Sequence, residues 1–438
     1  MTDASAPQNG SAPPGDTPSG RPLTAREEFQ RGWTIVLASV IGIYASLATI
    51  PFYAVQNLFG PLNQEFGWDR GGIAAAITVM GVANFFSSYL FGRLTDKVGS
   101  RPVALASGIL LAVGLFAITL NNGSLTQFLV TYFIVTLVAG GTLPLTYTRT
   151  VNQWFSTARG LALGFTLMGT SLAAMTMPFL YKEGIEAFGW RGVYYVGIAL
   201  ILVLWLPVCF FLFKDRSKAE QAAAASLATG STLGEAARTA TFWKMGISFF
   251  LVTCAMSGIV IHIVAMVTEN VSAGLVGQGM TQEAAVSQAR EQAAVVASVI
   301  GISLLVARLT VGYLIDKFHA PPIAAICFAV PAIGCYMLTG GGHGAAIVAA
   351  IMVGVALGAE LDLIAFFTSR YFGMKNYGQI YGWQYVFYTV GAGLSPFAFG
   401  WVFDSYGTYD PALWASIGAL LVAGLLMLTL PRYERGGH

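Results

Sequence analysis

Three ionisable residues lie deep inside long apolar segments of this sequence. Arg308 precedes Asp316, near the end of its segment, by eight positions, and Asp362 and Glu360 precede Arg370, at the end of another, by eight and ten. At about 1.5 Å of rise per helical residue, all three residues lie roughly 12–15 Å along the helix axis from the ends of their segments. A charge at the centre of a bilayer costs about 2.5–3.5 kcal/mol on insertion scales, so such residues need partners or a function. We therefore predict that Arg308 meets a carboxylate across the two helices.

The chemistry of this group points to an anion and a proton. The planar guanidinium of Arg308 presents a donor fork that matches a carboxylate, which makes it a candidate binding residue for a small organic anion. Glu360 and Asp362 are two positions apart, about 200° around a helix, so at most one can face Arg308 squarely. Desolvation disfavours a charged carboxyl group, so either one is a candidate proton-coupling residue. The alternative is a fixed ion-pair network that only stabilises the fold.

Other polar residues in apolar segments are weaker candidates. Arg149 ends the fourth segment, where it is either a second anion contact facing Arg308 or an ordinary boundary residue with its charge in water. His262, in the seventh, is either a proton relay or a hydrogen-bonded structural residue. Further residues that either line a substrate path or only pack with a satisfied polar group are Tyr44, Tyr53, Gln56, Asn57, Asn84, Tyr147, Tyr385 and Tyr388.

Composition places these residues in a membrane. The chain has 55% hydrophobic and 10% charged residues, against roughly 25% charged in soluble proteins, and its mean hydropathy is +0.66. The net charge of +2, without a basic run, argues against a nucleic-acid partner. The four cysteines lie in apolar runs without metal-ligand spacing, and no phosphate-binding or nucleophile motif occurs. We therefore predict no metal, no cofactor and no enzymatic activity.

Twelve apolar segments approach or exceed the roughly 20 residues that a membrane-crossing helix needs. They lie near 33–59, 71–95, 102–120, 126–153, 158–181, 191–213, 241–270, 286–316, 321–339, 344–370, 378–403 and 411–430. We predict an all-α membrane protein of twelve transmembrane helices in two pseudo-symmetric six-helix bundles, 31–213 and 241–432. A linker, 214–240, joins the bundles, and the tails are 1–30, which we expect to be disordered, and 433–438.

The distribution of Lys and Arg orients these helices. Segments on the side of the two termini carry eighteen Lys and Arg, and segments on the opposite side carry four. Because positive residues favour the cytoplasmic side, both termini are predicted to be cytoplasmic. The short loops suggest a bacterial inner membrane.

A repeated motif supports two similar halves. Residues 92–102 read Gly-Arg-Leu-Thr-Asp-Lys-Val-Gly-Ser-Arg-Pro, and residues 312–318 read Gly-Tyr-Leu-Ile-Asp-Lys-Phe, 220 positions later in a chain of 438. A repeat at half-length in a membrane chain is typical of paired bundles that rock about a central site. The motif resembles the signature loop of the major facilitator superfamily.

Within that superfamily the chain resembles the monocarboxylate and oxalate/formate branch. The elements that carry this resemblance are Phe-Gly-Trp-Asp-Arg at 66–70, Trp-Phe followed by Arg-Gly-Leu-Ala at 154–162, and Val-Ala-Arg at 306–308. Two positions depart from it. Related monocarboxylate carriers often have an acidic residue where Leu304 stands, and the segment 378–403 lacks the lysine of oxalate-type carriers.

The resemblance implies a secondary transporter that works by alternating access as a monomer in a lipid bilayer. It favours symport of a proton with a monocarboxylate-like anion, and it leaves open an oxalate/formate-type anion exchanger or proton-driven efflux of a cationic or lipophilic compound. It assigns a gating role to the repeated motif, whose residues here are Gly92, Asp96, Arg101, Gly312 and Asp316. The pairs Gly160/Gly164 and Gly354/Gly358 have the spacing of close helix contacts.

Overall fold

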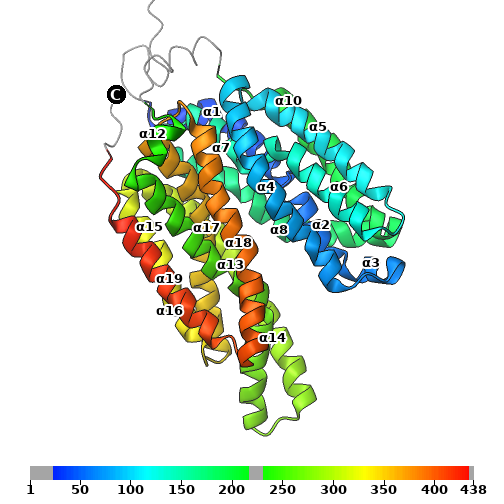
Figure 1. The fold of residues 1–438 in the computed structure, drawn as a ribbon. Helices are drawn as coiled ribbons and strands as arrows, with labels where there is room; N and C mark the ends of the chain where they lie inside the picture. Colours follow the sequence, from blue (N-terminus) through cyan, green and yellow to red (C-terminus); the bar gives the residue numbers. More distant parts are fainter. Residues whose placement is uncertain (1–22, 217–229, 434–438) are drawn as a thin grey trace, which may run out of the picture.

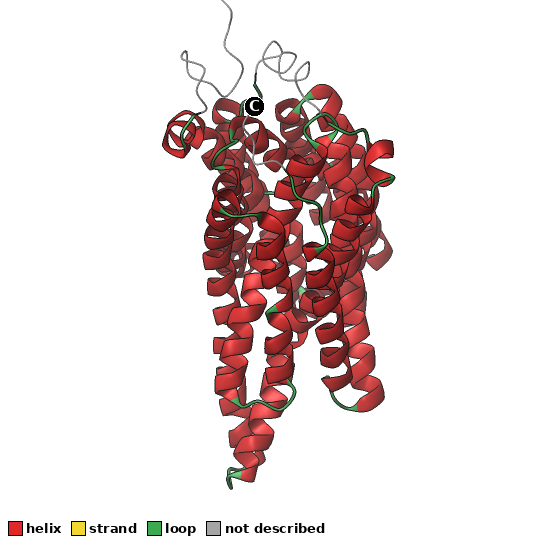
Figure 2. Cartoon of the chain, turned by 90° about the vertical axis from the view of Figure 1, so that its left-hand side faces the viewer, coloured by secondary structure: helices red, strands yellow, loops and turns green. Residues whose placement is uncertain are grey.

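The computed structural model describes residues 23–216 and 230–433, and all regular secondary structure in these ranges is helical (Figures 1 and 2). The helices form two bundles, which we call the N-bundle and the C-bundle (Figure 1). The end of the bundles at which the described chain begins and finishes is called the terminal end, and the opposite end is called the far end. In Figure 1 the terminal end is at the top.

The N-bundle contains the first six predicted spans. Its elements are α1 (Ala25–Tyr44), α2 (Ile50–Asn57), α3 (Phe59–Phe66), α4 (Arg70–Val98), α5 (Ser100–Thr119), α6 (Leu125–Val138), η1 (Gly140–Thr142), α7 (Pro144–Trp154), α8 (Arg159–Phe188), η2 (Gly189–Arg191), α9 (Gly192–Ala199), the π-helical turn η3 (Leu200–Trp205) and α10 (Leu206–Leu212).

The C-bundle contains the other six. Its elements are α12 (Leu233–Ala237), α13 (Ala240–Gly277), α14 (Gln282–Lys317), α15 (Ala320–Ala329), α16 (Pro331–Leu338), α17 (His343–Phe372), α18 (Tyr377–Tyr406) and α19 (Asp410–Leu428). The short α12 precedes the long helices and has its own capping box between Thr232 and Glu235. The two hydrogen bonds from Thr232 lower the pKa of the Glu235 carboxyl, so the cap keeps its charge.

The predicted count of twelve spans agrees with this arrangement. Among the described residues, nine continuous helical stretches are long and apolar enough to cross a membrane, and the stretch 159–212 holds two spans because it turns back at η2. The two remaining spans are broken. The first is divided between α1 and α2, and the fourth between α6 and α7.

Proline and glycine explain these breaks. Pro51 lies in the first turn of α2 and Pro144 in the first turn of α7, where the missing amide hydrogen costs nothing. Gly140, before α7, packs so tightly that an added Cβ would lie 1.9 Å from the hydroxyl of Ser87. Pro331 likewise begins α16, which divides the ninth span. The fourth span is therefore divided into α6, the short η1 and α7.

Several predicted boundaries need correction. Helix α1 begins at Ala25 behind a Thr24 capping box, so residues 25–30 are helical and not part of a disordered tail. Residues 1–22, 217–229 and 434–438 lie outside the described residues. The predicted linker therefore shortens, since α12 occupies 233–237 and α13 begins at Ala240.

Helices α13 and α14 are longer than predicted, at 38 and 36 residues. At about 1.5 Å per residue they measure roughly 55 Å, against about 30 Å of bilayer hydrocarbon. The hairpin between them projects beyond the other helices at the far end (Figures 1 and 2).

The two bundles meet mainly along two helix crossings, α4 against α18 and α8 against α14, with smaller contacts of α7 and α8 against α17 and of α7 against α18. Among the described residues, the hydrogen bonds between the bundles lie either at the terminal end or at one central contact from Arg308 to Thr170. The described parts of the far end carry no such bond between bundles. The hydrogen bonds between the bundles are therefore concentrated at the terminal end, and the bundles diverge toward the far end (Figure 1).

Candidate functional site

Arg308 lies where the two bundles meet. Its Nη1 donates to Oδ1 of Asp362 on α17 at 2.9 Å, and its Nη2 donates to Oγ1 of Thr170 on α8 at 3.1 Å. Arg308 is 2% exposed and Asp362 is fully buried. The predicted equal depth of these residues on α14 and α17 thus corresponds to a direct contact. A single guanidinium joins a carboxylate of the C-bundle to a hydroxyl of the N-bundle.

This contact leaves hydrogen-bonding capacity unused. Nε of Arg308 and Oδ2 of Asp362 are buried, and neither has a hydrogen-bond partner among the described residues. Buried polar atoms are nearly always paired, so unpaired atoms on two facing charged groups indicate a place where another polar group binds. Close helix packing holds the arginine there. An added Cβ at Gly164 of α8 would lie 2.6 Å from the carbonyl oxygen of Arg308.

Glu360 points in a different direction from Asp362. Its carboxyl Oε1 is hydrogen-bonded to the hydroxyl of Thr253 on α13, inside the C-bundle, and its Oε2 is buried without a partner among the described residues. The Thr253 hydroxyl also donates to the carbonyl of Phe249 at 2.7 Å. The 200° separation of two positions on a helix explains this division. Asp362 is thus the carboxylate that meets Arg308.

Two partly exposed tyrosines, one from each bundle, lie near Arg308. The hydroxyls of Tyr53 on α2 and Tyr388 on α18 are close enough to interact electrostatically with its charge and with each other. Tyr385 stacks on Tyr388, with ring centroids 5.4 Å apart. Tyr44 of α1 is hydrogen-bonded to Thr176 at 2.9 Å. Both bundles therefore contribute aromatic side chains near the guanidinium.

The remaining predicted path residues have varied surroundings. Gln56 is exposed at the end of α2, and the side chain of Asn57 donates to the Tyr53 carbonyl at 2.8 Å. Asn84 is half-buried on α4, with an Oδ1 that has no partner in the described chain. Of the two alternatives for Tyr147, lining the path or packing with a satisfied hydroxyl, the structure has the second. Tyr147 is fully buried within the N-bundle, where its hydroxyl accepts from Trp205 Nε1 at 2.9 Å.

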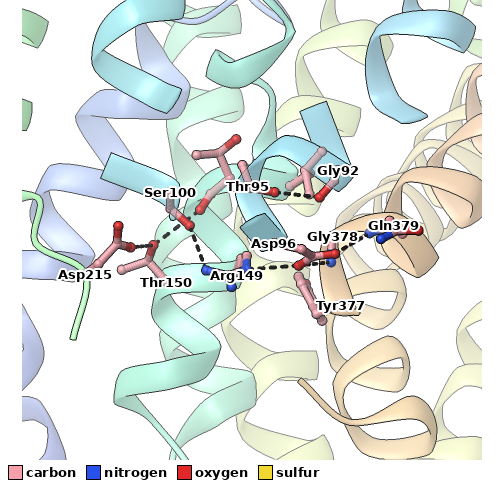
Figure 3. A network of polar contacts seen from close by, with 12 residues as sticks. Gly92, Thr95, Asp96, Ser100, Arg149, Thr150, Asp215, Tyr377, Gly378 and Gln379 are labelled. Atoms are coloured by element: carbon pink, nitrogen blue, oxygen red, sulfur yellow. Dashed lines mark hydrogen bonds and ion pairs between the residues drawn. The ribbon is translucent and has the colours of Figure 1, made fainter. Parts of the chain in front are cut away.

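Arg149 belongs to the terminal end and does not face Arg308. Its Nε donates to Oδ1 of Asp96 at 3.2 Å and its Nη1 to the hydroxyl of Ser100 at 3.4 Å (Figure 3). Asp96 in turn accepts from the backbone amides of Gly378 and Gln379, each at 3.0 Å. These amides begin α18 of the other bundle. The prediction of a second anion contact is thus replaced by a charge that supports a contact between bundles.

The first copy of the repeated motif provides the close helix approach at this point. An added Cβ at Gly92 would lie 2.2 Å from the carbonyl oxygen of Gly378, so only glycine fits there. Arg101, predicted to be part of the gate, stays within the N-bundle. Its Nη2 donates to the Phe210 carbonyl at 2.6 Å, and its backbone amide donates to Asp215 at 2.9 Å.

The second copy makes the corresponding contact with α8. Asp316 accepts from the backbone amides of Gly160 and Leu161, at 2.7 and 2.9 Å. Gly312 packs against Gly160 one turn earlier. Both aspartates therefore cap the first turn of a helix in the opposite bundle, where the helix dipole favours a negative charge.

Three further bonds reinforce this closed terminal end. Arg159 donates to Ser369 Oγ at 3.1 Å, Arg370 to the Ser156 carbonyl at 3.1 Å and Tyr377 to Thr148 Oγ1 at 3.1 Å. Sequence reasoning missed most of these partners, as it missed Thr170 and Thr253. Hydroxyl residues in apolar helices are common and carry no distinctive spacing.

His262 lies at the far part of the C-bundle. Its Nε2 is 3.1 Å from the Pro396 carbonyl and its Nδ1 is 3.2 Å from the hydroxyl of Tyr409. The Pro396 carbonyl can only accept, so Nε2 carries the hydrogen, and Nδ1 of the neutral ring accepts from the Tyr409 hydroxyl. His262 is therefore fully hydrogen-bonded and away from Arg308. Within the ranges 23–216 and 230–433, no three His, Cys, Asp or Glu side chains are placed to hold a metal ion.

Comparison with known proteins agrees with this architecture. The sequence matches the Major Facilitator Superfamily over residues 32–282 and 260–438. It is 24% identical over 365 residues to the uncharacterized MFS-type transporter YhjX of Escherichia coli (strain K12), covering 82% of this chain and 85% of that protein. It is 29% identical over 203 residues to monocarboxylate transporter 13 of Rattus norvegicus, covering 44% of each. The match thus spans less than half of that transporter.

Solved structures show the same fold. The Escherichia coli fucose:proton symporter FucP aligns with a TM-score of 0.63 at 18% identity, over 92% of this chain and 98% of that one. The proton:xylose symporter XylE aligns with a TM-score of 0.69 at 11% identity, over 92% and 96%. Proteins of this family are transporters and not enzymes. The chain is a multi-pass membrane protein that belongs to the major facilitator superfamily.

Proposed function

We propose that this transporter carries a small organic anion together with a proton, with Arg308 binding the anion and Asp362 taking the proton. The observation that carries this proposal is the buried contact of 2.9 Å between Arg308 and Asp362. It lies at the meeting point of the two bundles, where Arg308 also reaches Thr170 of the N-bundle. Substrate sites of rocking-bundle transporters lie at the interface of their repeats, near the bilayer midplane.

The buried pair links the anion to the proton. A substrate carboxylate competes with Asp362 for the Arg308 guanidinium, and the unpaired Nε offers it a second donor. A buried carboxylate that loses its partner is expensive to keep charged, so Asp362 takes up a proton when the anion binds. The site then holds one positive and one negative charge again. The empty site and the site that holds both the anion and the proton therefore have the lowest free energies, because neither contains an unpaired buried charge.

The relatives support an anionic substrate. The chain resembles monocarboxylate transporters of Rattus norvegicus and Bos taurus at 29% and 30% identity over less than half of its length. A fixed guanidinium beside the site repels a cationic compound, so it disfavours drug efflux. Anion exchange uses the same arginine without Asp362 changing its protonation.

The charge distribution supports an orientation. The excess of Lys and Arg on the side of both termini favours a cytoplasmic terminal end. With that orientation, the closed terminal end seals the cytoplasmic side and the separated far end faces outward. The bacterial relative YhjX supports placement in a bacterial inner membrane. We propose that the monomer, with its own two bundles, is the working unit.

Uptake into proteoliposomes with an imposed pH gradient tests this proposal. Pyruvate, lactate and oxalate are offered to the wild type and to Arg308→Lys. We expect gradient-driven uptake of at least one acid and its loss in the variant, because an ammonium group cannot reproduce the planar donor fork. Uptake that needs an internal anion and ignores the pH gradient would establish exchange instead. Extrusion of a cationic dye, with no acid transported, would refute an anion carrier.

A further inference from the structure

Four tyrosines form a stacked row along one face of α18. They occupy positions 377, 381, 385 and 388, a spacing that places them on consecutive turns. Successive ring centroids are 5.6, 6.1 and 5.4 Å apart, and the two pairs nearer the bilayer centre have interplanar angles of 16° and 21°. We call this row the tyrosine ladder. It runs from the terminal end to the surroundings of Arg308.

Burial decreases along the tyrosine ladder toward the far end. Tyr377 and Tyr381 are fully buried, Tyr385 is 6% exposed and Tyr388 is only half-buried. At the terminal end Tyr377 is tied to Thr148 of the N-bundle by a bond of 3.1 Å. The rings of Tyr377 and Tyr381 therefore fill the part of the path nearest the closed terminal end. Tyr388 is the ring at which the ladder meets accessible space.

One face of the Tyr388 ring is covered by Tyr385, and within the described chain no other ring stacks on Tyr388. The same residue interacts electrostatically with Arg308, whose Nε lacks a partner, and with Tyr53 of the opposite bundle. An anion held by Arg308 therefore has an aromatic surface beside its carboxylate. A second tyrosine approaches from the N-bundle.

We propose that the transported anion is a monocarboxylate with an aromatic ring, whose carboxylate binds Arg308 and whose ring stacks on Tyr388. The inference rests on the proposed anion transport and narrows its substrate class. A small aliphatic acid needs only an apolar wall, whereas a ring gains from an offset-stacked partner held in place by a second tyrosine. Tyr53 closes on the same ring from the N-bundle, so the substrate contacts both bundles.

A matched pair of acids tests the inference. Phenylpyruvate and 3-cyclohexylpyruvate share a 2-oxo acid and a six-membered ring, and only the first ring is aromatic. Their half-saturating concentrations are measured by uptake into proteoliposomes of the full chain, with pyruvate as the small reference acid. The variants are Tyr388→Leu, Tyr385→Leu and Tyr388→Phe. Tyr406→Leu is the control, since Tyr406 lies on the same helix, is 64% exposed and lies outside the ladder.

We expect wild-type protein to half-saturate at an about two- to tenfold lower concentration of phenylpyruvate than of 3-cyclohexylpyruvate. Tyr388→Leu should bring this ratio close to one and Tyr385→Leu should reduce it. Tyr388→Phe and Tyr406→Leu should keep it, because both retain the stacked ring. Equal half-saturation in the wild type, with uptake that still needs Arg308, would overturn the aromatic substrate alone. No uptake of any of the three acids would overturn the anion transporter as well.

Discussion

Gly160 of α8 and Gly312 of α14 face each other across the two bundles with no room for a side chain. A Cβ on Gly160 would lie 2.4 Å from the carbonyl oxygen of Gly312, and a Cβ on Gly312 would lie 2.5 Å from that of Gly160. Asp316, one turn further along α14, caps the first turn of α8 through the amide of Gly160 at 2.7 Å. The closed terminal end therefore requires glycine at both positions, because any other residue would bring a Cβ against the opposite backbone.

Gly312→Ala should hold the terminal end open. The added methyl group meets backbone, which cannot move aside, and overpacking of this kind costs about 1–3 kcal/mol. The cost falls only on the conformation in which α8 and α14 touch, so the equilibrium shifts toward separation of the bundles at this end. Maleimide labelling of Ser369→Cys, which is 5% exposed in the closed conformation, should become faster, and uptake should fall.

Gly301→Ala is the matched control for this prediction, since it lies on the same helix with nothing within 4 Å of an added Cβ. It should label and transport as the parent does. Equal labelling of Gly312→Ala and Gly301→Ala would show that the glycine contact does not govern closure.

Much of the central site could be predicted from sequence because helix geometry is regular. A fixed rise per residue places Arg308 and Asp362 at one depth. Because a buried charge is costly unless it is paired, an ion pair between them could be predicted. The choice between Asp362 and Glu360 needs the rotation of α17 about its axis, which spacing from Arg370 does not contain. The partner of Arg149 was not predicted, for a related reason. That partner, Asp96, lies 53 positions earlier, and only packing of α4 beside α7 brings them together.

The fold shows the same contrast. Twelve spans follow from hydrophobic length, which the bilayer imposes on every segment. The breaks within the first and fourth spans depend on where a helix can restart, and Pro51 and Pro144 mark those points without showing the direction that the chain then takes. The projection of α13 and α14 was missed because Thr268, Glu269 and Asn270 end an apolar segment without ending α13, and Glu283, Arg290 and Glu291 lie inside α14.

Asp362→Asn and Glu360→Gln should separate the roles of the two carboxyl groups. Asp362→Asn removes both the partner of Arg308 and the proton acceptor, so pH-gradient-driven uptake should fall at least about tenfold while exchange of internal for external anion persists. Glu360→Gln should retain most uptake. Both the Phe249 carbonyl and the Glu360 carboxyl compete for the single hydrogen of the Thr253 hydroxyl, and an amide at 360 can satisfy both by donating to Thr253.

Counterflow and gradient-driven uptake are measured on the same proteoliposomes to check this prediction. Loss of gradient-driven uptake in Glu360→Gln, with normal coupling in Asp362→Asn, would assign the proton to Glu360. Thr253→Val serves as a second probe of position 360, because it removes the hydroxyl without touching Arg308.

Arg149 and Asp96 should behave as a buried ion pair. The bond of 3.2 Å joins side chains that are 7% and 6% exposed. Removing only the arginine, as in Arg149→Met, leaves a buried carboxylate with one partner fewer and should destabilise the protein by about 3–5 kcal/mol. The double variant Arg149→Met with Asp96→Asn should recover part of that loss, since no charge is then left unpaired.

Thermal unfolding of the purified protein in detergent measures this double-mutant cycle. Transport assays on the same variants distinguish a support role from anion binding. If Arg149 contacted the substrate, Arg149→Met would raise the half-saturating concentration of the anion at normal stability, and Asp96→Asn would restore nothing.

Glu28 of α1 should be one of the most important single carboxylates for the stability of the N-bundle. It is 2% exposed and accepts from the backbone amides of Ser156, Thr157 and Ala158 at 2.9–3.1 Å, and from the Ser156 hydroxyl at 2.7 Å. These amides precede α8, the helix that Asp316 caps from the other bundle. Glu28→Ala leaves several buried donors unpaired and should cost about 2–4 kcal/mol.

Glu28→Ala should also weaken the closed terminal end, because the turn at 155–158 positions the first turn of α8 against Asp316. Glu28→Ala should therefore lower the unfolding temperature and speed maleimide labelling of Ser369→Cys together. Arg31→Ala, an exposed change on the same helix, should do neither. Destabilisation without faster labelling would mean that Glu28 anchors α1 alone, and that the position of α8 at the crossing with α14 is set by the glycine contact.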